Sequence, residues 1–243
     1  MFFGMTHRIV IPLFAGAVLL PQAPAAAMEE EPVPPALAAE GWRLLKTSDA
    51  PVASFALAED GTVRVVAEGA VGFLARPVET APGRRLSWRW RVEAAAPATD
   101  LRAKGEDDRP AAVHVFFPRA EGERGLFGRI GDSLRAAAVG DAFAGRVITY
   151  VWGGTEPPGT RFPNPFMRED GALIVLRGPE APTGAWVAEC VDPAADHRAA
   201  FGRDATVPNW IALSADTDDR GGRSETIFTV PAFVTPDPQG DCP

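Results

Sequence analysis

Strict alternation of polar and apolar residues between Arg85 and Val92 is the feature that most constrains the fold of this chain. Leucine, tryptophan and valine occupy the even positions, and arginine and serine occupy the odd ones. Successive side chains of a β-strand point to opposite faces, so the segment is predicted to be a strand with one buried and one solvated face. The alternation also places Trp88 and Trp90 on the buried face.

Short apolar segments recur along the rest of the chain, and clusters of glycine and proline separate nearly all of them. Some are apolar on both faces, which is typical of central strands covered on two sides: 113–117, 147–152 and 173–176. The remaining segments are 62–65, 71–75, 185–191, 211–215 and 226–230. Because regular helical spacers are missing between them, the pattern predicts an all-β fold, an antiparallel β-sandwich of jelly-roll type, rather than a doubly wound α/β fold.

Two short helices are predicted within this β architecture. The first covers residues 193–201, where Asp192 is the expected N-cap, a proline follows at the first helical position, and Gly202 ends the helix. The second lies in a long connection, residues 119–146, where apolar residues recur at spacings of three and four: Phe127, Ile130, Leu134 and Ala138. The connection is interpreted as a packed insertion, with a lid or a partner-binding arm as alternatives.

The N-terminal segment has the pattern of a secretory signal peptide. His7 and Arg8 precede an apolar run of about 12 residues, which is too short to span a bilayer, and three alanines at 25–27 form a small-residue cleavage site. We therefore expect residues 1–27 to be removed and the mature protein to be periplasmic or secreted, with an uncleaved anchor as the alternative. The rest of the sequence has no apolar run long enough for a bilayer, so no membrane span is expected after cleavage.

Composition divides the mature chain into three parts. Residues 28–41 are acidic and proline-rich and are expected to form a flexible N-terminus, residues 42–235 a single β-sandwich domain, and residues 236–243 a C-terminal tail. The formal net charge of −8 argues against nucleic acid as a partner, because an acidic surface repels phosphate. Cys190 and Cys242 are predicted to form a disulfide in an oxidising compartment, with two unpaired thiols as the alternative.

Carboxylates gather at the ends of two predicted strands. Asp107 and Asp108 precede the strand at 113–117, and Asp216 and Asp218 follow the strand at 211–215. If these ends adjoin, several carboxylates meet at one rim of the sheet, where oxygen ligands suit a hard cation such as calcium. The predicted metal ligands are Asp108, Asp216 and Asp218. The alternatives are acid and base chemistry on a glycosidic bond, led by Asp108 and Asp216, or a solvated set of turn residues.

Trp152 is the tryptophan predicted to lie at a binding surface. It ends a predicted strand just before two glycines, where an exposed indole would offer a stacking platform for a sugar ring. Histidine chemistry is sparse, because His114 and His197 are the only histidines after residue 27, and a three-histidine zinc site is therefore excluded.

An ordered series of segments resembles the bacterial family known as domain of unknown function 3047. The series comprises residues 86–92, Asp100, residues 105–108 and 113–117, and residues 149–153, 186–189, 196–202 and 211–218. The resemblance extends over roughly residues 42 to 233, and it implies an exported or periplasmic protein with a sandwich-like domain but no particular activity. The chain departs from the family pattern in the length of the 119–146 connection, in the turn at 219–222 and in having phenylalanine at position 228.

The strand pattern, the tryptophans and the carboxylates together predict a non-catalytic protein that binds a carbohydrate or another envelope ligand, with calcium as the candidate cofactor. The first alternative is a glycan-acting hydrolase that uses a carboxylate pair. The second is a structural or interaction module of the envelope that docks a partner through the 119–146 connection.

Overall fold

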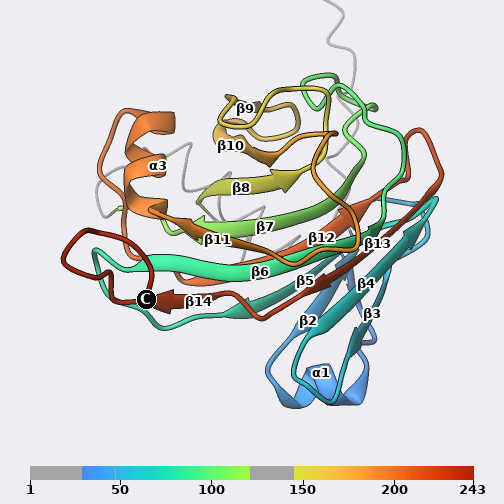
Figure 1. Ribbon diagram of the computed structural model, residues 1–243, viewed down its shortest axis with the longest axis horizontal. Helices are drawn as coiled ribbons and strands as arrows, with labels where there is room; N and C mark the ends of the chain where they lie inside the picture. The colour runs from blue at the N-terminus through green and yellow to red at the C-terminus, as the bar shows by residue number, and fades with distance from the viewer. Residues whose placement is uncertain (1–28, 47, 121–144) are drawn as a thin grey trace, which may run out of the picture.

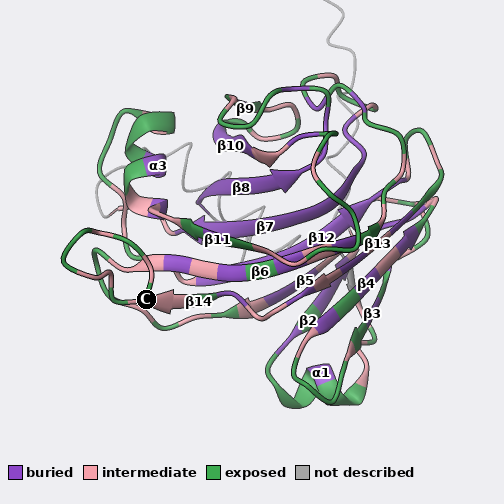
Figure 2. Ribbon diagram, viewed as in Figure 1, coloured by how far each residue is buried: buried purple, intermediate pink, exposed green. Residues whose placement is uncertain are grey.

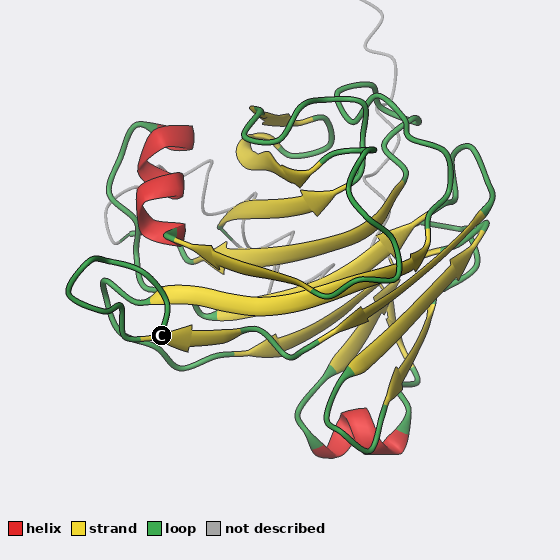
Figure 3. Cartoon of the chain, in the orientation of Figure 1, coloured by secondary structure: helices red, strands yellow, loops and turns green. Residues whose placement is uncertain are grey.

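Two β-sheets lie face to face in the computed structural model, which describes residues 29–46, 48–120 and 145–243 (Figure 1). Strands make up most of the regular structure, and the helices are short (Figure 3). The predicted all-β sandwich is therefore confirmed. The predicted signal segment at 1–27 and the predicted helix around residues 127–138 lie outside the described residues.

Within the described residues, the larger sheet has eight strands and the smaller sheet has six. In spatial order the larger sheet consists of β1 (Glu29–Glu31), β2 (Arg43–Lys46), β5 (Val71–Pro77), β12 (Trp210–Asp216), β7 (Arg109–Phe117), β8 (Arg146–Trp152), β10 (Arg168–Arg177) and β9 (Arg161–Asn164). The smaller sheet consists of β11 (Val187–Val191), β6 (Arg85–Ala94), β13 (Arg223–Phe228), β4 (Val63–Glu68) and β3 (Ser54–Leu57), with β14 (Ala232–Val234) pairing β6 as well.

Antiparallel pairing dominates both sheets, including pairs of strands that lie far apart in the chain such as β5 with β12 and β4 with β13. Within the described residues, β8 and β10 form the one parallel pair of named strands, with Gly171 opposite Val147. The chain between them turns back through β9, which pairs antiparallel with β10.

The core between the sheets is built on the alternation of β6. Leu86, Trp88, Trp90 and Val92 are each at most 2% exposed, as the sequence pattern predicted. The Trp90 ring meets the edges of Trp88 and Trp152 at centroid distances of 5.3 and 5.5 Å. Edge-to-face packing of this kind adds to the burial of apolar area, so the tryptophans act mainly as core residues.

The central strands of the larger sheet are buried on both faces, which explains why their sequences are apolar throughout (Figure 2). Ala111, Val113 and Val115 of β7 face the core between the sheets. On the opposite face, Leu101 from the preceding loop and Phe162 from β9 cover parts of β7, β8 and β10. The predicted central strands therefore occupy the positions that their composition indicates.

Helix α3 (Pro193–Phe201) coincides with the predicted helix at 193–201. The Asp192 carboxylate accepts a hydrogen bond from the backbone N–H of Ala195, and Gly202 ends the helix in the left-handed conformation with φ of 67°. The hydroxyl of Tyr150 in β8 donates to the Asp196 carboxylate at 2.8 Å. This contact anchors the helix to the larger sheet.

The segment expected to be a flexible N-terminus differs from that expectation. It contains β1 and the helix α1 (Pro35–Ala39), and Leu37 of that helix is fully buried in the core. Proline and glutamate give the segment a disordered composition, but Leu37 inserts into the core and the backbone N–H of Trp42 donates to the carbonyl of Leu37. Ordered structure therefore begins before Trp42.

A disulfide joins Cys190 of β11 to Cys242, with the two Cα atoms 5.8 Å apart. It ties the predicted C-terminal tail to the edge of the smaller sheet, and the bond fits an exported protein. Among the described residues, neither helix has the length and apolar character needed to cross a bilayer.

Candidate functional site

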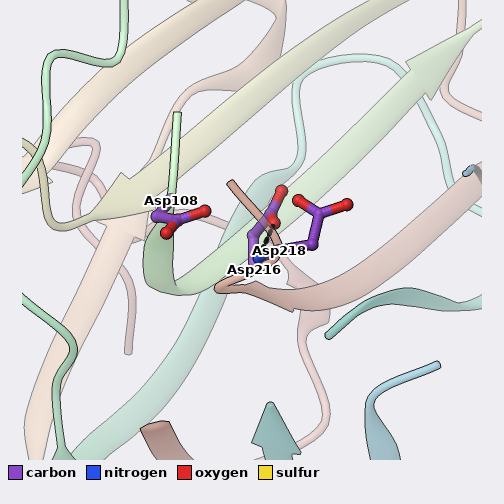
Figure 4. Close-up of side chains that lie close together, drawn as sticks. All are labelled: Asp108, Asp216 and Asp218. Atoms are coloured by element: carbon purple, nitrogen blue, oxygen red, sulfur yellow. Dashed lines mark hydrogen bonds between the residues drawn. The ribbon is translucent and has the colours of Figure 1, made fainter. Parts of the chain in front are cut away.

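The start of β7 and the end of β12 adjoin at one rim of the larger sheet, because the two strands are antiparallel neighbours with Asp216 opposite Arg109. This register brings together three of the carboxylates singled out in the sequence. Oxygen atoms of Asp108, Asp216 and Asp218 all lie within 4.8 Å of one another (Figure 4). We call these three side chains the aspartate cluster.

Asp108 holds the loop that follows β12. Its two carboxylate oxygens accept hydrogen bonds from the backbone N–H groups of Asp219 and Arg220, at 3.0 and 2.9 Å. The side chain is 2% exposed, and this burial raises the pKa of Asp108, while the two backbone donors act in the opposite direction. Asp108 is therefore a buried hydrogen-bond acceptor that fixes the backbone at Asp219 and Arg220.

Asp216 is the most strongly perturbed carboxyl group of the cluster. Burial raises its pKa well above the ordinary value, the guanidinium of Arg109 at 3.3 Å opposes the change, and a hydrogen bond with the Asp218 side chain raises the pKa further. Asp218 in turn accepts a hydrogen bond from the hydroxyl of Ser48 at 3.1 Å. Among the described residues, the contacts of Asp216 and Asp218 thus include two carboxyl groups but one cation, Arg109.

Arg109 is the cation nearest the cluster, and it is only 6% exposed. It contacts the carboxylate of Asp107 at 2.9 Å as well as that of Asp216. Burial lowers the pKa of Arg109, but Asp216 and Asp107 raise it by more, so the guanidinium stays charged. Asp107 therefore pairs with Arg109 and lies outside the aspartate cluster, and its role as a binding residue stays a prediction.

The oxygen spacing of the aspartate cluster is compatible with one hard cation. Calcium takes oxygen ligands at about 2.3–2.6 Å, so two ligands on opposite sides of the ion stand roughly 4.6–5.2 Å apart. The three aspartates meet that limit with oxygens within 4.8 Å of one another. A cation here would also relieve the repulsion between the carboxylates.

A small pocket of about 80 Å³ adjoins the cluster, and Asp108, Arg109 and Trp152 all line it. Its other walls are short side chains and glycines: Ala95, Ala96, Pro97, Ala98, Pro110, Gly153, Gly154, Gly178, Pro179, Ala181 and Thr183. Pockets that enclose a whole small molecule measure about 300–1,000 Å³. This one therefore has room for part of a ligand, such as a single polar substituent.

Trp152 does not form the open stacking platform predicted from the sequence. It is 3% exposed, because β8 is a central strand and the indole packs against Trp90. The indole contributes a wall of the small pocket instead. The most exposed of the six tryptophans is Trp186, which directly precedes β11.

Two residues that complete the rim were missed in the sequence. Arg109 follows Asp107 and Asp108 directly, yet nothing in the sequence distinguishes it from other arginines at strand starts. Ser48 lies 170 positions from its partner Asp218. For Trp186 a signal exists, because it stands at the start of a predicted strand with glycine at 184.

Comparison with known proteins identifies a family and similar solved structures. The model of the family described as "Protein of unknown function (DUF3047)" matches residues 40–230. No curated protein matches the sequence. A solved structure, the xyloglucanase domain of NopAA, a type three effector from Sinorhizobium fredii in complex with cellobiose, is similar with a TM-score of 0.42 and 11% identity. The similarity covers 80% of this chain and 94% of that one.

Proposed function

This chain belongs to the DUF3047 family, and we propose that it is an exported, non-catalytic binding protein. In this proposal Asp108, Asp216 and Asp218 hold a calcium ion. The pocket beside them takes part of a carbohydrate or of another envelope ligand. The mature protein acts in the periplasm or after secretion, in line with the Cys190–Cys242 disulfide and the signal-peptide pattern at residues 1–27.

The observation that carries the proposal is the excess of buried negative charge at the rim. Asp216 is 6% exposed and Asp108 is 2% exposed, and their oxygens lie close to those of Asp218. Arg109 is the neighbouring buried cation, and it is shared with Asp107. Uncompensated buried carboxylates either take up protons or bind a cation, and an oxygen-only set of this spacing favours calcium.

The pocket supports the binding half of the proposal. It combines an acceptor in Asp108, a donor in Arg109 and an apolar wall in Trp152. Hydroxyl groups on an apolar ring are recognised by this combination of a few polar groups and an aromatic surface. The small volume fits one hydroxymethyl or hydroxyl-bearing edge rather than a complete sugar chain.

Calcium titration of the purified exported protein tests the proposal. At a free calcium concentration about a hundred times the dissociation constant, binding adds about 2.7 kcal/mol, which corresponds to a rise in melting temperature of roughly 5–10 °C. The variant D216N/D218N should show no such rise. Magnesium at the same concentration serves as the ion control, because it dehydrates more reluctantly and needs stricter geometry. An equal rise in the variant, or none in the wild type at millimolar calcium, would contradict the proposal.

A hydrolase is the second candidate, and the closeness of Asp108 and Asp216 favours it. Retaining glycosidases hold two carboxyl groups about 5–5.5 Å apart. In this protein, however, both carboxylates are buried and hydrogen-bonded or ion-paired. Release of reducing ends from envelope glycans, abolished in D108N and retained in D107N, would favour the hydrolase over the binding protein.

A further inference from the structure

A second set of side chains lies on the outward face of the smaller sheet, away from the aspartate cluster. Val187 of β11 pairs with the buried Trp90 of β6, so Trp186 is set beside the outward-facing side chains of β6. The guanidinium carbons of Arg89 and Arg91 each lie 5.1 Å from the centre of the Trp186 ring. We call Trp186, Arg89 and Arg91 the arginine–tryptophan patch.

The arginines of this face differ in how their charge is compensated. Arg64 pairs with Glu225 at 2.6 Å, Arg223 also pairs with Glu225, and Arg91 pairs with Glu93. Arg89 is exposed and has no carboxylate within ion-pair distance among the described residues; its described partner is the indole of Trp186. In a chain of net charge −8, Arg89 is therefore an uncompensated cation held beside a partly exposed aromatic ring.

A guanidinium next to an indole can bind a ligand in which a carboxylate is attached to a ring with an apolar face. The carboxylate accepts two parallel hydrogen bonds from the guanidinium, and the C–H face of a sugar ring packs on aromatic surface. One carboxylate per sugar unit matches Arg89, which has no carboxylate within ion-pair distance among the described residues.

We propose that the arginine–tryptophan patch binds an acidic polysaccharide through its uronic acid units. The carboxylate of one unit pairs with Arg89, and the ring of that unit packs on Trp186. Arg91, held by Glu93, keeps the indole in place. The inference goes beyond the calcium site and does not require it, because the patch and the aspartate cluster lie on different sheets.

Binding of hexagalacturonate to the purified exported protein, measured by calorimetry at low ionic strength with calcium chelated, tests the proposal. Cellohexaose, a neutral chain of the same length, should bind at least about tenfold more weakly, since a charge-assisted hydrogen bond is lost. Arg89→Gln should weaken hexagalacturonate binding by a similar factor. The matched control is Arg64→Gln, which removes the same charge from the same face but from an arginine that Glu225 already neutralises.

A second readout uses the exposure of Trp186. Bound hexagalacturonate should reduce acrylamide quenching of tryptophan fluorescence in the wild type, and this protection should be absent in Trp186→Phe. A melting temperature within a few degrees of the wild type verifies that each variant is folded.

Three results would overturn the proposal: equal affinity for the acidic and the neutral chain, an Arg64→Gln effect as large as that of Arg89→Gln, or binding to phosphatidylglycerol vesicles without binding to hexagalacturonate. None of them would affect the calcium-dependent stabilisation expected at the aspartate cluster. Loss of that stabilisation with hexagalacturonate binding intact would contradict only the calcium proposal.

Discussion

The aspartate cluster and the arginine–tryptophan patch handle charge in opposite ways. At the rim of the larger sheet, carboxylates and Arg109 are withdrawn from water and tied by backbone and side-chain hydrogen bonds. On the smaller sheet, Arg89 stays exposed and its described contact is with Trp186. Removing a charge should therefore mainly change the stability of the fold at the rim, and mainly change affinity for a ligand at the patch.

The largest expected effect is that of Arg109→Gln. Breaking a buried ion pair by removing one partner costs about 3–5 kcal/mol, because the carboxylates are left without a counter-charge. Urea denaturation at neutral pH would measure the loss, and added calcium should restore part of it. The same substitution at Arg89 should change the unfolding free energy by at most about 0.5 kcal/mol. Similar losses for the two variants would remove the distinction between the regions.

The next effect concerns pH and Asp216. Its pKa is raised in the folded protein, so the neutral form contributes stability that is complete below the unfolded pKa near 3.8 and is lost as pH rises through the folded pKa. A tenfold difference in proton affinity between the folded and unfolded states corresponds to about 1.4 kcal/mol. The advantage of Asp216→Asn over the wild type in calcium-free buffer should thus be largest near pH 8 and shrink towards pH 5.

Burial lowers the pKa of His114 well below its ordinary value, and Arg109 lowers it further. That group contributes stability above the unfolded pKa of about 6.5 and loses it as pH falls. Because His114 is present in both proteins, its contribution largely cancels in the difference between Asp216→Asn and the wild type. A difference that stays constant from pH 5 to pH 8 would mean that Asp216 is charged throughout.

A smaller effect is expected for Ser48→Ala. The substitution removes the hydroxyl that donates to Asp218, and a hydrogen bond to a charged group contributes roughly 1.5–3 kcal/mol when buried and less when partly exposed, as here. We expect about 1 kcal/mol lower stability in thermal melts without calcium. Ser54→Ala, on the exposed edge strand β3, is the control and should have little effect.

The smallest effect is that of salt. Interactions between exposed charges are screened beyond a Debye length of about 10 Å at 0.1 M salt, whereas buried pairs are screened much less. Raising the salt concentration should therefore weaken hexagalacturonate binding a few-fold while leaving the Arg109→Gln stability loss nearly unchanged. Isothermal titration and urea denaturation in the same buffers would compare the two, and a salt-independent affinity would place the ligand away from Arg89.

The core and the meeting of the aspartates could be predicted because both follow from strand geometry. Alternation in β6 identified Trp88 and Trp90 as buried, and antiparallel neighbours place the end of one strand beside the start of the other. Nothing in the local sequence shows which strands are neighbours, however. The proximity of Asp108 to Asp216 was therefore only a conditional expectation, and Ser48 could not be found at all.

Trp152 and the N-terminal segment show where local patterns fail. Two glycines after Trp152 indicate the end of a strand, but whether that end is exposed depends on the elements that cover β8. Residues 28–41 have a disordered composition, and a single leucine, Leu37, is enough to fix part of them against the core. In both cases the deciding contact is made by residues distant in the sequence.

The disulfide makes the edge of the smaller sheet sensitive to the redox conditions around the protein. Cys190 lies in β11, the edge strand that follows Trp186, and its bond to Cys242 closes a separation of 52 residues. In a reducing compartment this strand would keep its pairing with β6 and the ion pair of Glu189 with Arg177, but the C-terminal segment around Cys242 would no longer be tied to it. If the chain is exported as proposed, formation of the bond after translocation would fix the edge that carries the arginine–tryptophan patch.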